Sequence, residues 1–305
     1  MLLNILTVAQ QVLILFILIG IGFVTNKAGI FNKNSIKRLT DFMLYVVTPA
    51  VIINSFSRKL DMVMLKGLAI VFAAAVAIHI VNIICSKAII HDRDKNRESV
   101  LRMAMIFSNC GYMSFPLQNA ILGSDGVFYG AAYVAVFNIV LWTYGEYMMN
   151  REYKFSPKKI ILNPGILGTA VGLVIFFTSM PIPEVVSTPI GYLADLNTPV
   201  AMIIIGFHLA DASFKVKGVN EFLSIGFRLI LSPVIMIAGL LLLGIRGDVL
   251  IVCAIAASAP IAAATTMFAN KFGADTPLSA TLVSMSTVLS IITMPVIVGI
   301  AQGLK

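Results

Sequence analysis

Charged side chains are scarce in this sequence. Asp, Glu, Lys and Arg together make up only 12% of its 305 residues. Hydrophobic residues make up 59%, and the mean hydropathy is +0.96. A soluble globule of this length cannot bury that much apolar surface. The composition therefore excludes an ordinary water-soluble protein and predicts a chain that uses lipid as its solvent.

Motifs for metal binding, ATP hydrolysis and catalysis are also missing. The three cysteines, Cys85, Cys110 and Cys253, lie in apolar segments and have neither a metal-ligand spacing nor an even count for a disulfide framework. No glycine-rich loop ends in Lys-Ser or Lys-Thr, and no segment carries a Ser/His/Asp set, paired aspartates or a His-Glu-x-x-His pattern. We therefore expect neither an enzyme nor an ATP-driven pump, and no cofactor or metal.

Long apolar segments account for most of the chain. Each is near or above the roughly 20 residues that span the hydrocarbon core as a helix. Barrel strands would be about 10 residues long and would alternate in polarity, so the segments are predicted to be helices. They lie at about 2–24, 36–57, 64–88, 99–123, 126–149, 160–180, 187–210, 219–244, 249–271 and 277–302. The first has no preceding basic region and is interpreted as a mature helix rather than a signal peptide.

The basic residues are distributed unevenly between the two sides of these segments. Sixteen of the 22 Lys and Arg residues fall in the loops of one side and five in those of the other, while Arg228 lies within a segment. Basic loops mark the cytoplasmic side of a membrane. We therefore expect a multi-pass protein of the cell (inner or plasma) membrane with both termini extracytoplasmic. Membrane topology also explains the net charge of +8 without a nucleic-acid partner.

Two sequence patterns recur at an interval of 150 residues. Thr48-Pro49 returns as Thr198-Pro199, and Gly123-Ser124-Asp125 returns as Gly273-Ala274-Asp275. Two halves of five helices each, 1–150 and 160–305, would be joined by a cytoplasmic linker at 151–159. An odd number of crossings inverts the second half relative to the first. The predicted fold class is an all-α membrane protein with ten transmembrane helices in two inverted five-helix repeats.

Helix-breaking and polar residues interrupt the fourth and ninth segments at equivalent places, because Ser108 and Ser258 are also 150 residues apart. Broken helices leave backbone groups free, and their N-terminal ends attract anions. If the two breaks meet, they would form a site for a small carboxylate. The predicted substrate-binding residues are Asn109, Cys110, Gly111, Pro116, Ser258, Pro260, Thr265 and Thr266. The alternative is that Pro116 and Pro260 only kink two packed helices.

Ionisable residues within apolar segments are candidates for function. Asp195 precedes Thr198-Pro199 and either carries a coupling proton or caps a distorted helix. Arg228 either supplies positive charge to an anion or extends to the cytoplasmic interface, and its nearness to the segment's start favours the interface. Glu146, near the cytoplasmic end of the fifth segment, is expected to pair with loop cations.

Several stretches resemble the auxin efflux carrier family over essentially the full length of the chain. They are Asn109 with Pro116 seven residues later, Ala259-Pro260 leading to 267–273, Tyr45 to Ala50, Asn163-Pro164, and Leu278 to Leu282 with Met294-Pro295. The resemblance implies ten helices with crossing fourth and ninth helices, similar to bile-acid symporters and sodium/proton antiporters. It also implies a scaffold at about 2–57 and 160–210 and a transport part at about 64–149 and 219–302.

The resemblance carries expectations about substrate as well. Bacterial members resemble permeases for malate or malonate, whereas plant members export auxin. This sequence lacks the long hydrophilic central loop of plant carriers and has Thr265 and Thr266 where those often place a second proline, so auxin itself is not the expected substrate. We expect secondary active transport of small organic acid anions, such as dicarboxylates or auxin-like carboxylates, by alternating access. An anion channel or a uniporter is the alternative, and a homodimer through scaffold helices is plausible by analogy.

Overall fold

The computed structural model describes residues 2–150, 152–211, 215–216 and 218–305. In that part of the chain the regular secondary structure is helical, apart from one isolated β-bridge. The α-helices are α1 (Leu2–Lys27), α2 (Lys33–Phe42), α3 (Thr48–Phe56), α4 (Met62–Ile89), α5 (Lys95–Ile106), α6 (Phe115–Val140), α7 (Glu146–Met149), α8 (Pro157–Ile161), α9 (Pro164–Thr178), α10 (Glu184–Asp195), α11 (Asn197–Ala210), α12 (Val219–Gly226), α13 (Ser232–Leu242), α14 (Gly247–Ser258), α15 (Ala264–Phe272) and α16 (Thr276–Gly303). Four π-helical turns join some of them: η1 (Met43–Val47), η2 (Cys110–Ser114), η3 (Leu141–Gly145) and η4 (Phe227–Leu231).

Seven helical stretches of the described chain are long and apolar enough, by length and composition, to cross a membrane. They are Ile5–Lys27, Lys33–Phe56, Met62–Ile89, Cys110–Met149, Glu184–Ala210, Val219–Leu242 and Thr276–Gly303. Helices α9 and α14 are apolar but shorter. The expected all-helical membrane protein is thereby confirmed. The count of ten stays a prediction, because the predicted fourth and fifth segments run together and the sixth and ninth are short.

The 40-residue stretch Cys110–Met149 contains a sharp turn within α6. Gly123 takes a φ of 62° and a ψ of −148° there, a conformation that glycine adopts without a steric penalty. Gly273, which ends α15, has a φ of 70°. These two glycines belong to the pattern repeated at 150 residues, and both have a positive φ, but the ψ of Gly273 is 26°, so their backbone conformations differ. The inversion of the halves remains a prediction.

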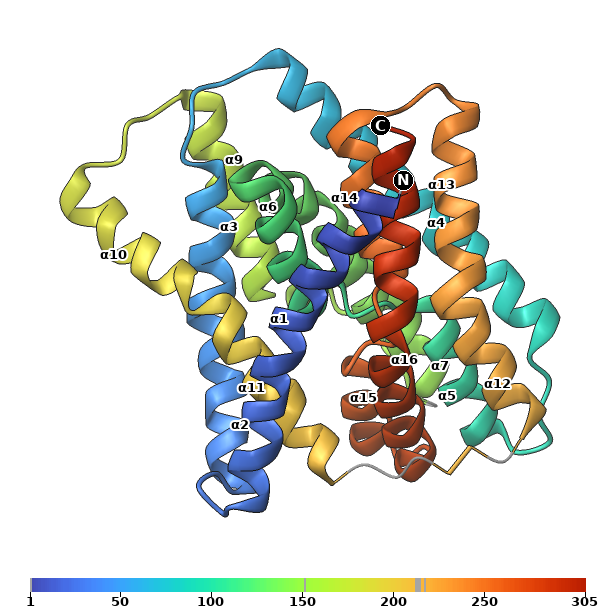
Figure 1. Cartoon of the computed structure of the whole chain (residues 1–305). Coiled ribbons are helices and arrows are strands. Elements are labelled where there is room, and N and C mark those ends of the chain that lie inside the picture. The colour runs from blue at the N-terminus through green and yellow to red at the C-terminus, as the bar shows by residue number, and fades with distance from the viewer. Residues whose placement is uncertain (1, 151, 212–214, 217) are drawn as a thin grey trace.

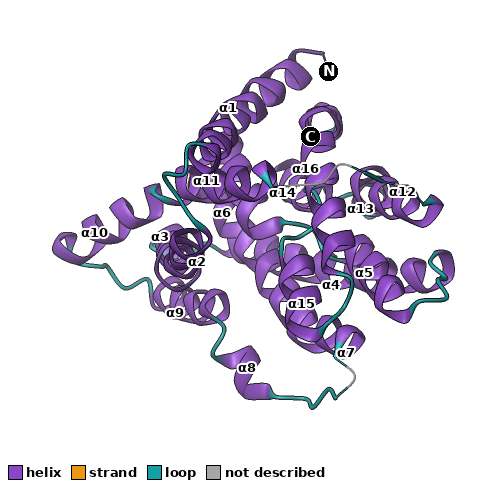
Figure 2. Ribbon diagram, turned by 90° about the horizontal axis from the view of Figure 1, so that it is seen from below, coloured by secondary structure: helices purple, strands orange, loops and turns teal. Residues whose placement is uncertain are grey.

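The helices divide between two sides of the molecule. In Figures 1 and 2, α2, α3, α9 and α10 lie on one side and α5, α12 and α13 on the other, with α14 between them. Figure 1 also shows both chain ends at the same end of the molecule. The division into a scaffold and a transport part remains a prediction. Arg151, which opens the expected linker, lies outside the described residues.

Helix α1 packs against both α11 and α16. Glycines allow α1 and α11 to approach each other very closely. A Cβ atom placed on Gly206 would lie 1.9 Å from the carbonyl oxygen of Ile19, and one on Gly22 would lie 2.3 Å from that of Ile203. Real side chains cannot approach backbone atoms so closely. In a membrane, where apolar burial drives little association between helices, such small residues permit the tight packing that holds helices together.

Candidate functional site

Two helices of the structure are interrupted where the sequence predicts breaks. Helix α5 ends at Ile106, and the chain is helical again from Cys110. Helix α14 ends at Ser258, and α15 begins at Ala264. Ala259 has an extended backbone (φ −60°, ψ 146°), as expected for a residue whose α conformation is disfavoured by the following proline. Each interruption thus leaves a C-terminal and an N-terminal helix end inside the protein.

The two interruptions pair with each other through their backbones. The Asn109 N–H donates a 2.7 Å hydrogen bond to the Pro260 carbonyl, and the Ala262 N–H donates a 3.0 Å bond to the Phe107 carbonyl. Between them, Ser108 and Ile261 form an antiparallel bridge. The broken helices therefore meet at a minimal two-stranded crossing, and the structure brings Asn109 and Pro260 together.

The N-terminal helix ends at this crossing have no side-chain cap. Asn109 precedes η2 and Ala263 precedes α15, and at neither position does a side chain accept a hydrogen bond from the following backbone. A Cβ atom placed on Gly111 would meet no atom within 4 Å, so there is open space beside one of these ends. The helix dipole places partial positive charge at these ends, although in α15 the Thr265 and Thr266 N–H groups already donate to the Ala262 and Ala263 carbonyls. The crossing therefore offers two electropositive helix ends, at least one of them beside free volume.

Arg228 donates hydrogen bonds to the free carbonyl groups at the C-terminal helix ends of the same crossing. Its side chain is completely buried, and Nη1 donates to the carbonyl oxygens of Met105 and Ile106, both at 3.2 Å. Nη2 donates to the Ala257 carbonyl at 2.5 Å and to Ser232 Oγ at 2.8 Å. The expectation that Arg228 reaches the cytoplasmic interface is wrong. The ends of α5 and α14 expose carbonyl groups that need donors, and a guanidinium supplies several in one plane.

The polar network behind the crossing includes two residues that sequence reasoning missed, Asn82 and Ser232. Ser232 Oγ donates to Asn82 Oδ1 at 3.1 Å, and Asn82 Nδ2 donates to the Ile106 carbonyl at 3.4 Å. Asn82 and Ser232 are 150 residues apart, so the repeat interval was a signal for this pair. Among the described residues, no carboxylate forms an ion pair with Arg228. Within the described residues its positive charge is therefore stabilised by carbonyl and hydroxyl dipoles but not neutralised by a counter-charge.

The remaining predicted binding residues differ in their access. Gly111 and Thr266 are half-buried, whereas the side chains of Cys110, Pro116, Ser258, Pro260 and Thr265 are buried. The Ser258 hydroxyl donates to the Ile255 carbonyl of its own helix at 3.2 Å. Asn109 is 6% exposed and lies at the pairing itself. In this conformation, backbone groups and half-buried residues are the parts of the crossing nearest to open space.

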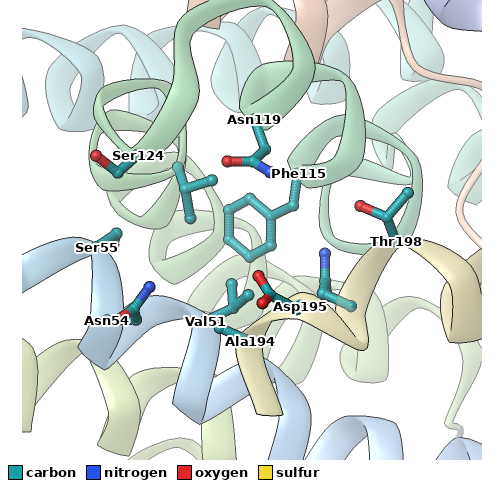
Figure 3. A pocket seen from close by; sticks show the side chains of 11 residues that line it. Val51, Asn54, Ser55, Phe115, Asn119, Ser124, Ala194, Asp195 and Thr198 are labelled. Atoms are coloured by element: carbon teal, nitrogen blue, oxygen red, sulfur yellow. The ribbon is translucent and has the colours of Figure 1, made fainter. Parts of the chain in front are cut away.

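A second polar region lies beside the crossing. A cavity of about 100 Å³ is lined by residues from α3, α6, α10 and α11: Val51, Asn54, Ser55, Phe115, Asn119, Ser124, Val127, Ala194, Asp195, Asn197 and Thr198. Figure 3 shows Asn119 and Ser124 entering from one side and Asn54 and Asp195 from the other. Phe115 directly precedes Pro116, so the cavity adjoins the helix that begins at the crossing. The structure thus places Asp195 in this cavity, not at the crossing.

The charge of the cavity is negative. Asp195 is the one acidic residue in its lining, and no lysine, arginine or histidine lines it. Close by, Arg58 Nη1 lies 2.5 Å from Asp125 Oδ1, and the Arg58 guanidinium lies 5.0 Å above the ring of Phe128. Arg58 Nε also donates to the carbonyl of Ser55, which lines the cavity. An ion pair between the end of α3 and α6 thus lies beside a cavity that holds a single carboxylate.

Another intramembrane carboxylate behaves as the sequence suggested. Glu146 is 2% exposed, and its Oε1 accepts a 2.6 Å hydrogen bond from Lys159 Nζ in the short helix α8. The expected pairing with a loop cation is confirmed, so Glu146 needs no role in transport. Among the described residues, no group of three or more His, Cys, Asp and Glu side chains is arranged to hold a metal ion.

Known proteins are similar in sequence to this chain over nearly its whole length. A family model described as "Membrane transport protein" matches residues 7–156 and 148–298. An uncharacterized transporter from Methanothermobacter thermautotrophicus is 23% identical over 295 residues, covering 94% of this chain and 96% of its own length. An uncharacterized transporter from Methanocaldococcus jannaschii is 23% identical over 296 residues, covering 92% and 94%. Family and relatives alike point to transport rather than catalysis, whereas the malate-permease resemblance stays a prediction.

Proposed function

Because the chain belongs to this family of membrane transport proteins, we propose that it is a secondary transporter of small organic acid anions that works by alternating access. The observation that carries the proposal is the crossing, where uncapped helix N-termini and the buried Arg228 converge. Interrupted helices near the membrane midplane are a common way for secondary transporters to build a substrate site. The proposal thus assigns the substrate site of a membrane transport protein to the crossing of the two interrupted helices.

The electrostatics of the crossing favour an anion. Two helix N-termini contribute partial positive charge, and Arg228 contributes a full charge that no carboxylate offsets within the described residues. Charge interactions are stronger in a weakly polarisable interior than in water. The Asn109 amide adds a directed donor for a carboxylate oxygen. Because both Nη atoms of Arg228 already donate to backbone carbonyls and to Ser232 Oγ, Arg228 acts on the substrate through its electric field rather than by direct contact.

Alternating access requires two parts of the protein to move relative to each other. The polar cavity lies between α3, α10 and α11 on one side and α6 on the other, which the resemblance assigns to the scaffold and the transport part. Asp195 is exposed in this cavity, where a carboxylate can take up and release a proton from water. We propose that protonation of Asp195 is coupled to movement of the transport part.

The experiment that tests the proposal is uptake into proteoliposomes containing the purified full chain. Labelled malate, malonate and an auxin-like acid are offered while pH, sodium and voltage gradients are imposed one at a time. Saturable uptake that shows counterflow supports a carrier. Non-saturating flux without counterflow would indicate a channel, and voltage-driven uptake indifferent to protons and sodium would indicate a uniporter. Absence of flux for every carboxylate would overturn the substrate class but not the family.

A further inference from the structure

A second and larger cavity lies on the side of the molecule where the sequence places the basic loops. It has a volume of about 480 Å³ and is lined by Lys87, Arg102, Tyr144, Tyr147, Met148, Asn150 and Tyr153. These residues come from the end of α4, from α5, and from the chain between η3 and the turn after α7. The lining contains two cationic side chains, three phenols and no acidic residue, which is a combination suited to a phosphate group.

The cationic side chains are held at fixed places in this cavity. Lys87 Nζ lies 5.5 Å from the centre of the Tyr144 ring, and no acidic side chain of the described chain pairs with it. Arg102 donates from Nε and Nη2 to the Ile90 carbonyl at 3.3 and 3.0 Å. It also pairs with Glu98, which in turn contacts Lys95. Lys87 therefore provides the less compensated of the two charges.

The tyrosines form a continuous aromatic wall. The ring centres of Tyr144 and Tyr147 are 6.3 Å apart, and those of Tyr147 and Tyr153 are 5.8 Å apart. Tyr147 is 63% exposed. Tyrosines concentrate at the membrane–water boundary, where the ring contacts apolar matter and the hydroxyl reaches headgroups and water. The wall therefore marks the level of the headgroups.

An exposed apolar stripe on α4 leads directly to Lys87. Phe72, Val76, Ile80 and Ile84 follow one another at four-residue intervals and are 44%, 36%, 52% and 61% exposed. Residues four apart lie on one face of a helix. In a membrane this face contacts acyl chains, and it ends three residues before Lys87. A molecule bound at the cavity can therefore place a charged group beside Lys87 and a hydrocarbon chain along Ile84 and Ile80.

We propose that this cavity binds the phosphate headgroup of an anionic phospholipid in the leaflet on the side of the basic loops. Lys87 and Arg102 contact the phosphate, the tyrosine hydroxyls donate hydrogen bonds to it, and the acyl chains lie on the α4 stripe. A free phosphate ester shares the headgroup chemistry but has nothing to place on the stripe, which is why we assign the lipid. The proposal concerns binding and does not depend on which solute the protein transports.

The test measures phosphatidylglycerol retained by the purified full chain in detergent, by native mass spectrometry, with phosphatidylcholine as the neutral comparison. Lys87→Gln is expected to lower phosphatidylglycerol retention by about fivefold, since one basic residue at a membrane surface contributes roughly 1 kcal/mol. Lys87→Arg should retain the lipid. The matched control is Lys271→Gln, because Lys271 Nζ also lies over an aromatic ring, 5.3 Å from that of Trp142, but lines neither cavity.

Two results would overturn the proposal. The first is equal phosphatidylglycerol retention by the Lys87→Gln and Lys271→Gln proteins when both elute as monodisperse, helical species. The second is displacement of the lipid by millimolar glycerol 3-phosphate, which would assign the cavity to a soluble phosphate ester. If the Lys87→Gln protein does not fold, Tyr147→Phe is compared with Lys271→Gln instead. Tyr147→Phe removes one hydroxyl at the exposed rim of the cavity and is expected to lower phosphatidylglycerol retention by a smaller factor.

Discussion

Arg228 and Ala257 are joined by a 2.5 Å hydrogen bond from a guanidinium nitrogen to a backbone carbonyl, deep inside the protein. The same guanidinium donates to the carbonyls of Met105 and Ile106. One side chain thus connects the C-terminal ends of α5 and α14, which belong to different halves of the chain. The relative position of the two broken helices, and with it the shape of the crossing, depends on this arginine.

Replacing Arg228 with Met is expected to destabilise the protein by roughly 3 kcal/mol, since each buried carbonyl left without a donor costs about 1–3 kcal/mol. Arg228→Lys keeps the charge but cannot reach both helix ends, so an intermediate loss is expected. Thermal unfolding in detergent measures both. Arg246→Met is the matched control, because Arg246 also donates to a backbone carbonyl, that of Leu304 at 2.7 Å, but is exposed. Equal shifts for Arg228→Met and Arg246→Met would contradict the structural role.

Replacing Asn109 with Ala is expected to reduce anion uptake about tenfold or more, because a hydrogen bond to a charged group contributes roughly 1.5–3 kcal/mol. The pairing with Pro260 uses the backbone N–H of Asn109, so the fold should survive. Initial uptake rates and thermal unfolding are compared for this variant and for Asn34→Ala, which changes an exposed asparagine in α2. Unchanged uptake by folded Asn109→Ala protein would remove the central residue from the proposed site.

Replacing Asp195 with Asn is expected to abolish accumulation driven by a pH gradient while leaving exchange of internal for external substrate intact. The amide keeps the size of the side chain but cannot take up and release a proton. Asp211→Asn serves as the control, since Asp211 also lies in the second half and is exposed but does not line the cavity. If pH-driven accumulation persists in the Asp195→Asn protein, another group carries the coupling proton or there is none.

The Arg58–Asp125 pair connects the end of α3 to α6 and should break when these parts separate. Arg58→Gln is expected to increase the labelling of a Ser55→Cys variant by a membrane-impermeant maleimide up to about fivefold, since a partly exposed ion pair contributes about 0.2–1 kcal/mol. Ser55 is 2% exposed and lines the neighbouring cavity. Exchanging the two charges, with Arg58→Asp and Asp125→Arg together, should restore slow labelling. Failure of this exchange to slow the labelling would assign the effect to other contacts of Arg58.

Two glycines of α1 provide a matched pair for helix packing. Gly22→Ala is expected to destabilise the protein by about 1–3 kcal/mol, because the added methyl would meet the backbone of Ile203 at 2.3 Å. A Cβ atom on Gly20 would meet nothing within 4 Å, so Gly20→Ala should be neutral or slightly stabilising. Thermal unfolding in detergent compares them. A similar effect of both substitutions would mean that α1 and α11 are not packed as closely as described.

Features that depend on local chemistry could be predicted from the sequence. The apolar segments, the chain turns at Gly123 and Gly273, and the helix interruption before Pro260 follow from side-chain polarity and from the conformations that glycine and proline allow. The pairing of Glu146 with a loop cation was also predictable, because opposite charges near one membrane boundary attract each other, and the structure identifies that cation as Lys159. The buried position of Arg228 was not predictable, because its nearness to the start of a segment does not indicate on which face of the helix the side chain lies.

The sequence by itself determined three properties of this protein. It places the chain in a membrane, it marks the positions at which helices are interrupted, and it gives the few residues that can be charged within the apolar segments. These properties reside in the residues and their neighbours along the chain. Only the tertiary structure decided that Asn109 meets Pro260, that Arg228 connects Met105 with Ala257, and that Asp195 faces a separate cavity. Each of these relationships joins residues distant in sequence, and which partner satisfies a free backbone group is settled by the packing of whole helices.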